Sequence, residues 1–89
     1  MDCYRIEWDS RAFKELQNIP VCDAKRVLKK VSELSKSPYS GTALKGGFKG
    51  YFRIRSGNYR VIYSIKKNHL LILILRVGSR KNIYRTKSL

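Results

Sequence analysis

Apolar and polar residues alternate at the start of the chain. In residues 3–8, Tyr4, Ile6 and Trp8 fall on one side of an extended segment, and two charged residues fall on the other. A period of two residues is typical of a strand with one buried face. We therefore expect a half-buried strand at residues 3–8.

Two helices are expected after this strand. Asp9 or Ser10 can cap the first helix, which extends to about Asn18 and ends before Pro20. The second helix is expected at residues 23–35. Helical spacing gives each helix one apolar face: Ala12, Phe13 and Leu16 in the first, and Ala24, Val27, Leu28, Val31 and Leu34 in the second.

A loop rich in glycine separates these helices from three further strands, predicted at residues 51–56, 59–65 and 70–77. The last is apolar on both faces, which indicates a central strand. Consecutive strands joined by short turns pair antiparallel. The expected fold is therefore α+β, a single domain over residues 1–89. Two helices would pack on one face of a small, mainly antiparallel four-stranded sheet whose other face is open.

A two-residue turn at Gly57-Asn58 determines how two of these strands pair. The register places Arg55 opposite Arg60, and alternation turns both, with Arg53, toward the face opposite the helices. The same register pairs Ile54 with Val61, Arg53 with Ile62, and Phe52 with Tyr63. Like charges directly across a ladder destabilise it. Three converging guanidinium groups therefore indicate an anion site.

The charge of the chain is strongly asymmetric. Twenty Lys and Arg against six Asp and Glu give a net charge of +14, and no carboxylate side chain follows Glu33. Twelve of the basic side chains lie in residues 41–89. Nucleic acid is the first partner that such a surface predicts, and an acidic protein is the second. This composition argues against paired-carboxylate catalysis and against a multi-ligand metal site, and we expect neither metal nor cofactor.

The sequence also predicts a cytoplasmic protein that does not enter a membrane. The N-terminus lacks the basic and apolar regions of a secretory signal. The longest apolar run, residues 70–75, is far shorter than the ~20 residues of a membrane helix. Cys3 and Cys22 are expected to be reduced, and His69 to be exposed in a turn.

The end of the chain adds Arg80 and Tyr84, whose spacing of four residues places them on one side of a helix or strand. Positive neighbours favour the phenolate form of a tyrosine. A tyrosine can also stack on a base.

Several segments together resemble the RelE/ParE superfamily of bacterial and archaeal toxin–antitoxin pairs. Residues 9–16 are followed by a second helix, and order and spacing agree over nearly the whole chain. The other matching segments are Leu-Lys-Gly at 44–46, Tyr-Phe-Arg-Ile-Arg at 51–55, Gly-Asn-Tyr-Arg-Val-Ile-Tyr at 57–63, and Arg-Val-Gly-Ser-Arg-Lys-Asn-Ile-Tyr-Arg at 76–85. The resemblance implies a RelE-like β-α-α-β-β-β fold.

The resemblance also implies an activity. The chain would be the toxin of a type II pair and an endoribonuclease that cleaves mRNA in the A site of the 30S ribosomal subunit. The ribose 2′-hydroxyl would attack the adjacent phosphate, and such cleavage needs no metal. By position, Arg60 and Arg80 would hold the phosphate, Arg53 and Arg55 stand where relatives often have a basic residue, and Tyr84 would orient the nucleotide. The implied contacts to the RNA backbone are Lys45, Lys49, Lys81 and Arg85.

One departure from the family concerns proton transfer. Many relatives carry histidine where Ser79 stands, and a guanidinium group stays protonated, so Arg53 and Arg55 are poor bases. Lys45, Lys49 and Tyr84 remain as titratable candidates. Either the fold lowers one of their pKa values or catalysis rests mainly on electrostatics.

Two other functions are compatible with a basic toxin-like chain. One is a ParE-like poison of DNA gyrase, against which the strand arginines and Tyr84 argue. The other is a non-catalytic module that binds RNA or the ribosome. In each toxin interpretation we expect an acidic cognate antitoxin that folds on the basic surface.

Overall fold

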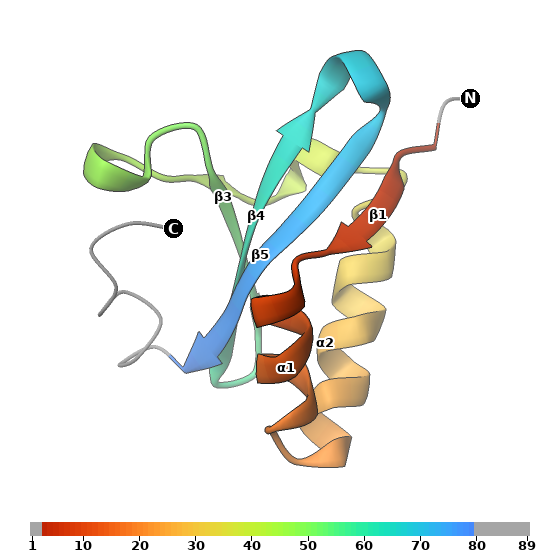
Figure 1. Cartoon of the computed structure of the whole chain (residues 1–89), viewed down its shortest axis with the longest axis vertical. Helices are drawn as coiled ribbons and strands as arrows, with labels where there is room; N and C mark the ends of the chain where they lie inside the picture. Colours follow the sequence, from red (N-terminus) through yellow and green to blue (C-terminus); the bar gives the residue numbers. More distant parts are fainter. Residues whose placement is uncertain (1–2, 80–89) are drawn as a thin grey trace.

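The computed structural model describes residues 3–79. Its elements follow the expected order, with one short strand added (Figure 1). In chain order they are β1 (Arg5–Trp8), α1 (Ser10–Gln17), α2 (Val21–Glu33), β2 (Thr42–Ala43), β3 (Phe52–Ser56), β4 (Tyr59–Lys66) and β5 (Leu71–Ser79). No helix in this part of the chain is long and apolar enough to span a membrane.

The strands form one sheet in the order β1-β5-β4-β3-β2. β1 runs parallel to β5, and every other neighbouring pair is antiparallel. Figure 1 shows α1 and α2 together on one side of the sheet. The predicted arrangement of two helices on a mainly antiparallel sheet is therefore confirmed, and so is an interior position for β5.

The fifth strand, β2, is absent from the prediction. Thr42 and Ala43 pair with Arg53 and Phe52 at the edge of the sheet. Both residues of β2 are exposed, and two residues are too few for an alternating pattern to be recognised. The sequence could therefore not distinguish this strand from the loop around it.

The β3–β4 hairpin has the predicted register. Arg55 lies opposite Arg60, Arg53 opposite Ile62, and Phe52 opposite Tyr63. Gly57 in the turn has a φ of 59°, a left-handed conformation that a residue with a side chain adopts only at a cost. The turn chemistry and the alternation of the two strands therefore agree, and this agreement made the register predictable.

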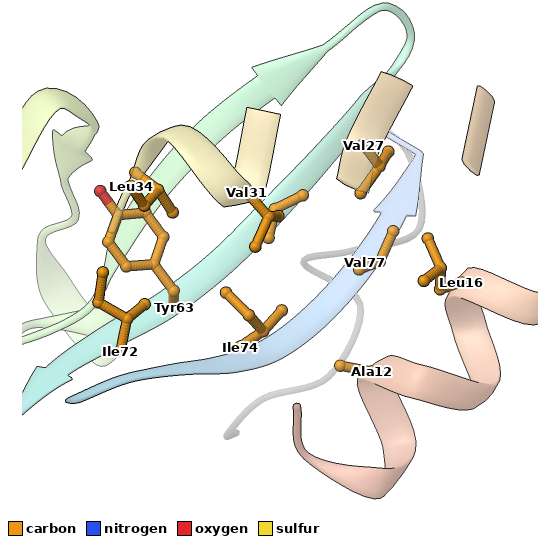
Figure 2. Packing of buried hydrophobic residues seen from close by; sticks show 10 residues of the cluster. Ala12, Leu16, Val27, Val31, Leu34, Tyr63, Ile72, Ile74 and Val77 are labelled. Atoms are coloured by element: carbon orange, nitrogen blue, oxygen red, sulfur yellow. The ribbon is translucent and has the colours of Figure 1, made fainter. Parts of the chain in front are cut away.

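The hydrophobic core lies between the two helices and the sheet (Figure 2). Figure 2 shows side chains of both helices facing those of β4 and β5. The buried cluster consists of Ala12 and Leu16 from α1, Val27 and Val31 from α2, Leu34 just after it, and Val61, Tyr63, Ile72, Ile74 and Val77 from the sheet. Burying such side chains stabilises the fold by about 1.5–3 kcal/mol for each large one.

Both helices bury a narrower stripe than the sequence predicts. Phe13 is 48% exposed and Leu28 is 45% exposed, although both were expected on the core face. Each helix contacts the sheet along one side only, so residues at the margin of its apolar face stay in solvent. α2 also begins earlier than expected, at Val21, with Pro20 as its N-cap residue. Proline fixes its own φ and suits the start of a helix.

A buried tyrosine fixes the segment that leads into β2. The Tyr63 hydroxyl donates a hydrogen bond of 2.8 Å to the carbonyl oxygen of Pro38. A Cβ on Gly41 would lie 2.5 Å from the Tyr63 hydroxyl oxygen and 2.6 Å from the Arg53 carbonyl oxygen, so only glycine fits there without a shift. Burial raises the pKa of Tyr63, and a main-chain hydrogen bond from Gly41 partly opposes this effect.

The raised pKa of Tyr63 predicts a loss of stability at alkaline pH. As the pH rises past 10.0, the ordinary pKa of tyrosine, the side chain loses its proton in the unfolded chain but keeps it in the folded protein. The free energy of unfolding should therefore be unaffected below about pH 10 and fall as the pH rises toward the folded pKa. Urea denaturation of the wild type and Tyr63→Phe at about pH 9 and about pH 11 tests this.

Tyr63→Phe should be less stable by about 1 kcal/mol at the lower pH, because it lacks the hydrogen bond to Pro38. Its further loss at the higher pH should be smaller than that of the wild type. An equal loss of unfolding free energy in the two proteins between the two pH values would show that Tyr63 is not the group with the raised pKa.

Candidate functional site

The arginines of the β3–β4 hairpin lie in three different environments. Arg60, on β4 in the middle of the sheet, is 8% exposed. Arg53 is half-buried and Arg55 is exposed. Arg55 and Arg60 are direct partners across the hairpin, so two like charges face each other at a cost of a few tenths of a kcal/mol or more. The structure therefore brings the predicted Arg55–Arg60 pair together but buries only one of its members.

Arg60 also has a partner on its other side. It lies opposite Gly78 of β5, and the neighbouring Tyr59 lies opposite Ser79. The end of β5 is thereby held directly beside Arg60. Arg80 follows Ser79 in the sequence, but it lies outside the described residues, as do Lys81, Tyr84 and Arg85.

The sheet face opposite the helices is not open along β4, contrary to the prediction. Arg60, Ile62 and Ser64 alternate with the core residues of this strand, and all three are buried. Ile62 is fully buried yet lies outside the helix-side core. An apolar residue among polar ones on that face was the signal in the sequence, since isoleucine rarely faces water within a sheet.

The two arginines of β3 line a groove at the edge of the sheet. The groove has a volume of about 690 Å³ and runs between β3, α2 and the segment at residues 37–42. Arg53 and Arg55 form part of its wall together with Lys30 and Glu33 of α2. The prediction placed these arginines only on the face opposite the helices. Both residues reach the groove wall because β3 packs directly against α2.

The two predicted RNA-contacting lysines lie on a separate loop. Lys45 and Lys49 flank a short 3-10 turn at Gly46–Phe48, and both are exposed. Gly46 and Gly50 have φ values of 67° and 95°, so the loop depends on glycine for its shape. Figure 1 shows this loop on the side of the sheet away from α1 and α2. Neither lysine lines the groove of Arg53 and Arg55.

A carboxylate that the sequence did not single out supports the end of β5. Glu15 of α1 accepts hydrogen bonds from Arg76, with 3.1 Å to Nε and 2.9 Å to Nη2. It also accepts the main-chain N–H of Val77 at 3.0 Å. β1 ends its pairing with β5 at Ile74, so Glu15 takes the place of a neighbouring strand for the next part of β5.

Metal ligands do not gather anywhere in residues 3–79. In this part of the chain no three His, Cys, Asp or Glu side chains lie close enough to hold one ion. Cys3 and Cys22 are both exposed and unpaired. The arginines of the hairpin supply positive charge and hydrogen-bond donors, which suit a phosphate group.

Comparison with known proteins identifies the family. Residues 6–84 match the family described as ParE toxin of type II toxin-antitoxin system, parDE. Toxin RelG of Mycobacterium tuberculosis is 34% identical over 88 residues, which cover 92% of this chain and 97% of RelG. The mRNA interferase toxin RelE of Escherichia coli is 28% identical over 80 residues, which cover 88% of this chain and 84% of RelE.

Solved structures agree with the sequence matches. The toxin–antitoxin complex RelBE2 of Mycobacterium tuberculosis contains a chain that superposes with a TM-score of 0.82 at 30% identity. The superposition covers 90% of this chain and 94% of that one. The resemblance noted in the sequence is thereby confirmed, and this chain belongs to the RelE/ParE family of type II toxin–antitoxin toxins.

Proposed function

We propose that this toxin is an endoribonuclease that cleaves mRNA in the ribosomal A site. The observation that carries the proposal is the arginine pair across the hairpin, Arg55 opposite Arg60, with Arg53 on the same strand. The relationship to a protein named an mRNA interferase supports it, at 28% identity. The absence of any carboxylate side chain after Glu33 also suits a site that must approach a polyanion.

The proposed reaction uses a nucleophile that RNA itself supplies. The 2′-oxygen of one ribose forms a bond to the adjacent phosphorus, and the bond from phosphorus to the 5′-oxygen of the next nucleotide breaks. The 2′-hydroxyl loses a proton and the leaving 5′-oxygen gains one, so the products carry a 2′,3′-cyclic phosphate and a 5′-hydroxyl. No metal has to activate a water molecule in this sequence of steps.

The protein then has to align the strand and stabilise the phosphorane. Positive groups aimed at the developing charge contribute most in a site from which water is excluded. Arg60 is the best placed of the hairpin arginines for this role because it is the buried one. We assign the same task to Arg80, a supporting role to Arg53 and Arg55, and stacking on the nucleotide to Tyr84.

The proposed partners are an mRNA, the 30S subunit of the ribosome and an acidic antitoxin. Lys45 and Lys49 are exposed on a loop, where they can reach the RNA backbone. We assign the same contact to Lys81 and Arg85. The related RelBE2 toxin was solved with its antitoxin, and a net charge of +14 favours an acidic antitoxin here.

A second candidate function follows from the description of the matching family, which names the ParE toxin. A ParE-like chain would poison DNA gyrase without cleaving RNA. This function needs no phosphate clamp on the hairpin, so it leaves the facing arginines unexplained. It nevertheless gives the cleavage experiment a clear alternative outcome.

Primer extension on an mRNA in a purified translation system tests the proposal. With ribosomes and the toxin, we expect discrete stops at codons in the A site, and none with the toxin on free mRNA. Normal mRNA together with gyrase-dependent DNA breaks would overturn the proposal in favour of the gyrase poison. RNA binding without cleavage or DNA breakage would reduce it to a binding module.

A further inference from the structure

The groove between α2 and β3 continues into a second hollow. The larger hollow has a volume of about 690 Å³ and the smaller one about 350 Å³. Lys30, Glu33 and Arg55 line both, so the two are continuous. We call them together the α2–β3 groove. It extends from the edge of β3 along the side of α2.

Basic residues lie on both walls of this groove. Arg26, Lys29 and Lys30 line it from α2, and Arg53 and Arg55 line it from β3. Glu33 is the one acidic residue in the lining of either hollow. Within residues 3–79, the three basic side chains of α2 form no ion pair. Their mutual repulsion at spacings of three and four residues costs stability, which an anionic ligand would recover.

The groove is continuous with the proposed reaction site. Arg53 and Arg55 belong to the hairpin that carries Arg60, and they also form one wall of the groove. β2 covers only two residues of β3, and Ile54 and Arg55 border the groove instead of a further strand. A strand of RNA that leaves the hairpin around this edge would therefore meet α2 next.

We propose that the α2–β3 groove binds the sugar–phosphate backbone of single-stranded RNA beside the cleaved nucleotide. Arg26, Lys29 and Lys30 are its main contacts to phosphate. The inference rests on the proposed ribonuclease function, but it concerns binding and not the chemical step. An acidic peptide is the competing occupant, and the connection of the groove to the hairpin arginines favours RNA.

The test compares two triple variants that lose the same charge. Arg26→Ala/Lys29→Ala/Lys30→Ala removes the α2 side of the groove. Lys14→Ala/Lys25→Ala/Lys67→Ala is the control, because none of its residues lines the groove. All six side chains are exposed, and five of them lie on α1 or α2, where alanine is the most favourable residue. Both variants should therefore fold. Fluorescence anisotropy measures their affinity for a 2′-O-methyl oligoribonucleotide, which cannot undergo attack by a 2′-hydroxyl, at several salt concentrations.

The groove variant should bind this RNA about ten-fold more weakly than the control variant at the same salt. Log affinity falls with log salt, and the loss of three phosphate contacts should make this fall less steep. The slope of the groove variant should be smaller in magnitude than that of the control by about 2. Equal affinities and slopes would overturn the proposal. Unchanged RNA binding with lost binding of a polyglutamate peptide would also overturn it and assign the groove to an acidic protein.

The two proposals fail separately in this design. Normal binding of the 2′-O-methyl RNA by a wild type that cleaves no mRNA would contradict the ribonuclease function alone. If both triple variants cleave mRNA at the wild-type rate and bind RNA equally well, only the proposal for the groove is contradicted.

Discussion

Replacement of Arg60 by alanine is expected to lower the rate of mRNA cleavage by about 10²–10³-fold. Loss of one preorganised donor to a developing oxyanion has an effect of this size in other enzymes. Arg60 lies in the central strand β4 between Arg55 and Gly78 and is 8% exposed. Its charge is therefore both fixed in place and shielded from water, the two conditions under which electrostatic stabilisation is strongest.

The control for this prediction is Arg11→Ala, which removes an exposed arginine from α1. It should cleave mRNA at the wild-type rate. Because Arg60 is buried, its alanine variant has to be checked for folding by thermal unfolding. Arg60→Lys retains the charge but loses the planar guanidinium, and it should be slower than wild type by about ten-fold or more. A folded Arg60→Lys or Arg60→Ala variant with wild-type cleavage would remove Arg60 from the site.

Glu15→Ala should produce the largest loss of stability among the polar substitutions considered, about 2–3 kcal/mol. The Glu15 carboxylate binds both Arg76 and the main-chain N–H of Val77. Side-chain exposures of 12% for Arg76 and 25% for Glu15 place the ion pair partly in solvent. We therefore expect less than the 3–5 kcal/mol of a fully buried pair. Urea denaturation gives the value directly.

A double-mutant cycle separates the two interactions of Glu15. Arg76→Met removes the ion pair and leaves the hydrogen bond to Val77. The coupling free energy between positions 15 and 76 should be about 1 kcal/mol or more. Glu15→Gln should retain part of the stability, since its amide oxygen can still accept from Val77. A Glu15→Ala protein as stable as the exposed-site control Glu7→Ala would contradict this role.

The β3–β4 hairpin shows what the sequence could predict. Gly57-Asn58 can form only a short turn, and the alternation on both sides of it admits one register. Local rules of this kind need no knowledge of the rest of the molecule. The pairing of Arg55 with Arg60 followed from them and is confirmed.

Features that depend on distant parts of the chain could not be predicted in the same way. The ion pair between Glu15 and Arg76 joins residues 61 positions apart, and no sequence pattern near either residue predicts it. The groove wall likewise combines Lys30 of α2 with Arg55 of β3. The apolar face predicted for the second helix leaves its basic residues on the outer side, but the sequence does not show which strand edge lies beside them.

In the candidate site, too, local features were predictable and long-range features were not. The hairpin arginines were placed in the correct register, yet the burial of Arg60 and the position of Arg53 and Arg55 beside α2 were not expected. The roles of Arg80, Tyr84, Lys81 and Arg85 concern positions beyond the described residues and stay predictions from the family resemblance.

Cleavage of an mRNA with a single 2′-deoxynucleotide tests the central claim most directly. The substitution is placed at the nucleotide whose 2′-hydroxyl should attack, on an mRNA bound in the ribosomal A site, beside an all-ribose control. The account predicts that the control is cut to a 2′,3′-cyclic phosphate and a 5′-hydroxyl, and that the deoxy-substituted linkage stays intact. Cleavage at that linkage would show that another nucleophile acts, and would contradict the proposed mechanism.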